Sequence, residues 1–113
     1  MNFHQPVPAI PVLDVPAAQE YYRDIFGFKV EWLMPDKSLG AASHANTALF
    51  FRQTAKPVHP AELWIYCDNV DDMYAHLNAS GANIVEEIEQ KPWNLRQFQV
   101  EDLYGNRLYF HGG

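Results

Sequence analysis

Basic residues and cysteine are scarce in this chain of 113 residues, and long apolar runs are missing. Eight Lys and Arg stand against 14 Asp and Glu, which gives a formal net charge of −6. Such a charge repels nucleic acid and anionic membrane surfaces, so neither is an expected partner, whereas a cationic small molecule is compatible with it. No apolar run approaches the roughly 18 residues that span a bilayer. The first residues also lack the basic and apolar segments of a secretory signal.

The single cysteine, Cys67, excludes an internal disulfide bond and indicates a reducing compartment. We therefore expect a cytoplasmic protein. Hydrophobic residues make up 48% of the chain, and its length suits one domain with its own core.

The order of predicted elements is strand–helix–strand–strand–strand, and it occurs twice. The first module covers about residues 5–52 and the second about 61–112, with a polar linker near 53–61. Pro16 and Gly27 are typical of the start and end of a helix, and Asp68 or Asn69 can cap a second helix over 70–79. The predicted fold is α+β, with strands over residues 7–15, 28–33, 39–44, 48–52, 62–67, 82–88, 96–102 and 106–111.

Three segments carry a resemblance to a known family: IPVLDV (10–15) followed by YYRDIFGF (21–28), WIYCDNVD (64–71), and RQFQVEDLYGNRL (96–108). Together they resemble the vicinal-oxygen-chelate superfamily, which includes glyoxalases, dioxygenases and bleomycin-resistance proteins. Leu103 stands where that family usually has proline. The resemblance implies two βαβββ modules whose curved mixed sheets form a cup with the helices outside. Chains of this size in the family are often homodimers, in which the partner chain can complete the cup.

Metal-dependent members of the family hold a divalent ion through His, Gln or Glu on the first, fifth and last strands. The corresponding positions here are Val7, Glu62 and Tyr109. Valine has no lone pair, a neutral tyrosine is a poor ligand, and one carboxylate does not hold a catalytic ion. We therefore expect no metal and no other cofactor. An open alternative is a metal site rebuilt from Glu62, His111 and either His4 or His44.

Side-chain alternation along the strands predicts which residues face the cup. If Glu62 points into the cup, Trp64 and Tyr66 do too, while Cys67 packs in the core as an inert thiol. Aromatic rings bind flat or cationic ligands by stacking, at roughly 0.5–2 kcal/mol each. The expected ligand-binding residues are Trp32, Phe51, Glu62, Trp64, Tyr66, Trp93 (on a loop at the rim), Gln97, Gln99, Arg107, Tyr109 and His111.

The favoured function is non-catalytic binding of a small molecule, with a cationic aromatic drug as one candidate, because the chain resembles the drug-sequestering bleomycin-resistance proteins. A glyoxalase- or dioxygenase-like enzyme with a rebuilt metal site is the main alternative, and a metal-free acid–base enzyme using Glu62 and Tyr109 is another. A third alternative is a regulatory subunit with a collapsed cup. In that case Trp64 and Tyr66 fill the cup, and Arg107 serves only to pair with a neighbouring glutamate.

Overall fold

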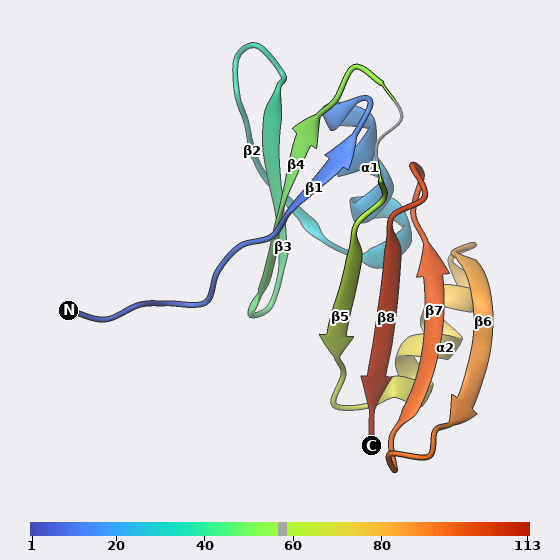
Figure 1. Cartoon of the computed structure of the whole chain (residues 1–113). Helices are drawn as coiled ribbons and strands as arrows, with labels where there is room; N and C mark the ends of the chain where they lie inside the picture. Colours follow the sequence, from blue (N-terminus) through green and yellow to red (C-terminus); the bar gives the residue numbers. More distant parts are fainter. Residues whose placement is uncertain (57–58) are drawn as a thin grey trace.

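The computed structural model describes residues 1–56 and 59–113, and it forms two modules with the same order of elements (Figure 1). The first sheet has the strand order β1-β4-β3-β2 and the second β5-β8-β7-β6. In each sheet the first strand of the module pairs in parallel with its last strand. The predicted α+β fold is thus confirmed. The elements are β1 (Ala9–Val12), α1 (Val15–Phe26), β2 (Lys29–Leu33), β3 (Leu39–His44), β4 (Thr47–Gln53), β5 (Glu62–Tyr66), α2 (Val70–Ala79), β6 (Asn83–Gln90), β7 (Arg96–Glu101) and β8 (Arg107–Gly112).

Both helices begin and end close to where their capping residues predict. The Asp14 side chain accepts a hydrogen bond from the Ala17 amide at 3.0 Å, and Gly27 closes α1 with a left-handed φ of 76°. Asn69 caps α2 in the same way by accepting from the Asp72 amide at 3.2 Å. No helix in the described part of the chain is long and apolar enough to cross a membrane.

The first strand is shorter than the predicted 7–15. Residues 1–8 form an extended arm that leaves the body of the molecule (Figure 1), and β1 begins at Ala9. Pro6 and Pro8 lie in this arm and have no amide hydrogen to donate to a sheet. At the other end, Asp14 leaves the strand to cap α1. The capping of α1 by Asp14 therefore ends β1 earlier than the predicted residue 15.

The two modules share one hydrophobic core on the helix side of the sheets. The Tyr22 ring of α1 lies 4.9 Å from the Phe51 ring, and Phe26 lies 6.4 Å from Phe110 of the second module. α1 packs against the first sheet and α2 against the second. Figure 1 shows both helices behind the sheets, so each sheet keeps one face that no helix covers. We call this face the open face.

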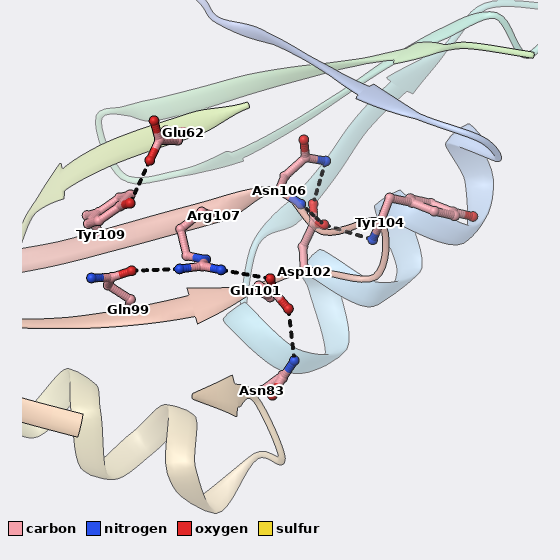
Figure 2. A network of polar contacts seen from close by, with 9 residues as sticks. All are labelled: Glu62, Asn83, Gln99, Glu101, Asp102, Tyr104, Asn106, Arg107 and Tyr109. Atoms are coloured by element: carbon pink, nitrogen blue, oxygen red, sulfur yellow. Dashed lines mark hydrogen bonds and ion pairs between the residues drawn. The ribbon is translucent and has the colours of Figure 1, made fainter. Parts of the chain in front are cut away.

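A buried polar cluster joins the modules at the turn before β8. The Asp102 carboxylate accepts from the Tyr22 hydroxyl of α1 at 2.8 Å. It also accepts from the backbone and side-chain amide nitrogens of Asn106 (Figure 2). Asn106 also accepts from the Ala61 amide at 2.8 Å and donates to the Pro11 carbonyl at 2.9 Å. Asn106 is fully buried. This cluster fixes how the second module sits against β1 and α1.

Candidate ligand-binding site

Three rows of side chains cross the open face of the second sheet from β5 through β8 to β7. The strand register creates these rows, because residues opposite one another on neighbouring strands point to the same face. One row is mainly charged and the other two are mainly aromatic. The rows are Glu62–Arg107–Glu101, Trp64–Tyr109–Gln99 and Tyr66–His111–Gln97.

The aromatic side chains of these rows pack against one another, and we call the stacked pair of Trp64 and Tyr109 the aromatic platform. The rings of Trp64 and Tyr109 are stacked with centroids 4.2 Å apart and planes 9° apart. The His111 ring meets Trp64 and Tyr66 edge-on, at 5.9 and 5.6 Å. Trp64 and Tyr66 remain 57% and 60% exposed, so their rings do not fill a collapsed cup within this chain. A planar molecule can stack on the free side of this pair.

The charged row and its surroundings leave one carboxylate without a cationic partner. Arg107 pairs with Glu101 at 2.8 Å, and Lys91 pairs with Glu86 at 3.3 Å. In the part of the chain that the structure describes, Glu62 makes no ion pair, and its one hydrogen bond is to a neutral group, the Tyr109 hydroxyl, at 2.5 Å (Figure 2). A negative charge therefore remains available beside the aromatic platform.

The hydrogen bond between Tyr109 and Glu62 also controls the protonation of the tyrosine. The hydroxyl donates to the carboxylate, and this bond is the main reason why the pKa of Tyr109 is raised. Tyr109 thus stays neutral well above pH 7.

The residues at the family's metal positions do not fit a metal ion. Val7 lies in the extended arm and has no donor atom, while Glu62 and Tyr109 bond to each other. Among residues 1–56 and 59–113, no three His, Cys, Asp or Glu side chains are arranged to hold an ion. The alternative set of Glu62, His111 and His4 or His44 is not brought together.

The prediction that Phe51 faces the ligand is wrong. Phe51 is fully buried beside Tyr22, and it is paired with Ile10, another core residue. Its neighbour Phe50 occupies the open face, where its ring lies 5.3 Å from the Trp32 ring. Phe50 was missed because β4 is apolar on both faces, so alternation alone does not show which phenylalanine points inward.

Two other expected residues differ in accessibility. Gln97 belongs to the row of Tyr66 and His111 but is only 3% exposed. Its amide nitrogen makes a long contact of 3.5 Å to Glu86, and its side chain is not accessible to a ligand at the surface. Trp93 is 54% exposed on the loop between β6 and β7, close to the end of the sheet where Gln97 pairs with His111.

Arg107 and Cys67 have clear structural surroundings. Arg107 donates to Gln99 at 2.9 Å and to Glu101 at 2.8 Å, which is the cross-strand pairing considered from the sequence (Figure 2). Cys67 is buried as expected, and burial raises the pKa of its thiol to about 11. The thiol is therefore protonated and unreactive at neutral pH.

Residues 4–110 match the model of the Glyoxalase/Bleomycin resistance protein/Dioxygenase superfamily, and the chain belongs to this family. No curated protein sequence gives a significant match. Several solved structures share the fold over almost the whole chain. The bleomycin-binding protein from Streptomyces verticillus, complexed with copper(II)-bleomycin, is 20% identical with a TM-score of 0.84 and covers 100% of this chain and 98% of its own.

Two further structures show how widely the fold is shared. TioX from Micromonospora sp. ML1 is 24% identical with a TM-score of 0.80, covering 97% of this chain and 96% of its own. Lactoylglutathione lyase from Agrobacterium tumefaciens is 20% identical with a TM-score of 0.79, covering 96% and 93%. A ligand-binding protein and a lyase are thus both structural neighbours, and the side chains of the site must decide between them.

Proposed function

We propose that this protein binds a small planar cation without transforming it. The observation that carries the proposal is the stacked pair of Trp64 and Tyr109 next to Glu62, the carboxylate that lacks a cationic partner among the described residues. A flat ring stacks on the pair while its positive charge lies near the carboxylate. The bleomycin-binding neighbour supports a drug-sequestering role, with cationic aromatic antibiotics as candidate ligands.

We further propose that two copies of the chain form the complete binding cup. The two sheets of one chain lie side by side, and their open faces do not oppose each other (Figure 1). The open faces and their edges carry large exposed apolar side chains, including Trp32, Met34 and Trp64. A facing sheet from a second chain would cover them, and sedimentation equilibrium distinguishes one chain from two.

We also propose a cytoplasmic location, because the single cysteine of the chain is a buried free thiol.

Isothermal titration with 9-aminoacridine, a planar cation, tests the proposed function. We expect binding, and we expect Trp64→Ala to raise the Kd by about two- to thirtyfold because it removes a stacking contact of roughly 0.5–2 kcal/mol. Glu62→Gln keeps an acceptor for Tyr109 but removes the charge, and it should also weaken binding. Copper(II)-bleomycin serves as a second ligand.

The controls distinguish binding at a specific site from non-specific attraction of a cation to the net negative charge of the protein. Acridine-9-carboxylate has nearly the same shape with the opposite charge and should bind much more weakly. Glu20→Gln removes an exposed charge from α1, away from the open face, and should leave the Kd unchanged. The proposal fails if neither cation binds or if Trp64→Ala binds them as tightly as the parent protein.

A further inference from the structure

A cavity with a volume of about 530 Å³ lies between the two modules on the helix side of the sheets. It is lined by the turn between β3 and β4, the end of α1, the end of β5 and the first turns of α2. The stacked pair of Trp64 and Tyr109 is not part of its lining. Tyr66 is the one expected ligand residue that reaches it. The cavity therefore adjoins the aromatic rows at Tyr66 but does not include the platform of Trp64 and Tyr109, and its size is typical of sites for small molecules.

The floor of the cavity is apolar and aromatic. Phe26, Phe28 and Phe110 line it and are only 4%, 7% and 4% exposed. Leu77 and Met73 of α2 complete this floor. A ligand that places one or two rings here removes apolar surface from water on both sides of the contact.

The mouth of the cavity is acidic. The exposed residues Asp68 and Asp72 line it, together with His44 and His76, and none of the lysines or arginines of residues 1–56 and 59–113 does so. Asp72 is already used, since it accepts from the Asn69 side chain at 2.8 Å at the start of α2. The Asp68 side chain makes no hydrogen bond or ion pair within the described residues, which leaves its charge for a ligand.

We propose that this cavity binds a small organic cation with an apolar body of one or two rings. The rings lie against Phe26, Phe28 and Phe110, and the ammonium or guanidinium group points to Asp68 at the mouth. Cys67 in the wall contributes no charge, because its thiol is protonated at neutral pH. This site is independent of the platform, so either can exist without the other.

Methyl NMR of the methionines tests the site directly. The chain has three methionines, of which Met73 lines the cavity while Met1 and Met34 do not. In protein labelled with ¹³C at the methionine methyl groups, 1-naphthylmethylammonium should shift the Met73 signal in a saturable way. The response should persist in Trp64→Ala, which removes the platform, so failure of the platform proposal would not affect this result. The anion 1-naphthoate, of similar size, should shift Met73 far less at the same concentration.

A matched pair of charge variants tests the role of the mouth. Asp68→Asn should raise the Kd for the ammonium ligand, read from Met73, by about two- to fivefold, as expected for a partly exposed ion pair. Glu20→Gln makes the same change of charge outside the cavity and should not alter this Kd. No Met73 response, an equal response to 1-naphthoate, or equal Kd values for the two variants would overturn the proposal.

Discussion

Replacing Asn106 with alanine is expected to lower the free energy of unfolding by about 3–5 kcal/mol. Asn106 is fully buried, and its side chain bonds to Ala61, Pro11 and Asp102 at 2.8, 2.9 and 3.0 Å. Truncation removes all three bonds and leaves the Ala61 amide and the Pro11 carbonyl without this partner. Each buried group left unsatisfied costs about 1–3 kcal/mol. Urea denaturation followed by circular dichroism measures the change.

Asn83 provides the matched control for Asn106. It is an exposed asparagine of the same module, and its amide makes only a long contact of 3.5 Å to Glu101. Asn83→Ala should change stability by no more than about 0.5 kcal/mol. Equal stability of the two alanine variants would show that the buried cluster does not hold the modules together.

The importance of Asn106 also shows where prediction from sequence stops. The segment RQFQVEDLYGNRL was recognised as a family motif, and strands over residues 96–102 and 106–111 were predicted on either side of its turn. The partners of Asp102 and Asn106 could not be predicted, because Tyr22 and Pro11 lie 80 and 95 positions away in the chain. The helix starts were easier to predict, because Asp14 and Asn69 accept hydrogen bonds from amides only three positions away.

The candidate site was predictable where strands alternate cleanly. In β5, apolar Leu63 and Ile65 alternate with Glu62, Trp64 and Tyr66, and the open face was assigned from this pattern. Alternation failed in two other strands. β6 is irregular on both sides of Glu86, so the burial of Gln97 on the neighbouring strand had no local signal. In β4, adjacent phenylalanines fit either face, and the parallel pairing with β1 decides between them.

Truncation of the two phenylalanines of β4 should therefore lower stability to very different extents. Phe51→Ala removes a fully buried ring that lies 4.9 Å from Tyr22, and we expect it to lower the free energy of unfolding by about 3–5 kcal/mol. Phe50→Ala removes a half-buried ring on the open face and should cost clearly less, about 1 kcal/mol. Denaturant unfolding of both variants measures the difference.

Ligand binding should show the reverse order. Phe50 and Trp32 lie 5.3 Å apart on the open face of the first sheet, which in the proposed dimer faces the platform of the partner chain. Phe50→Ala should then weaken 9-aminoacridine binding, whereas Phe51→Ala, measured where it remains folded, should not remove any contact to the ligand. Equal free energies of unfolding for Phe50→Ala and Phe51→Ala would contradict the inward position of Phe51. Unchanged affinity in Phe50→Ala would confine the ligand to the second sheet, since a cup built from two sheets needs an aromatic contact from each.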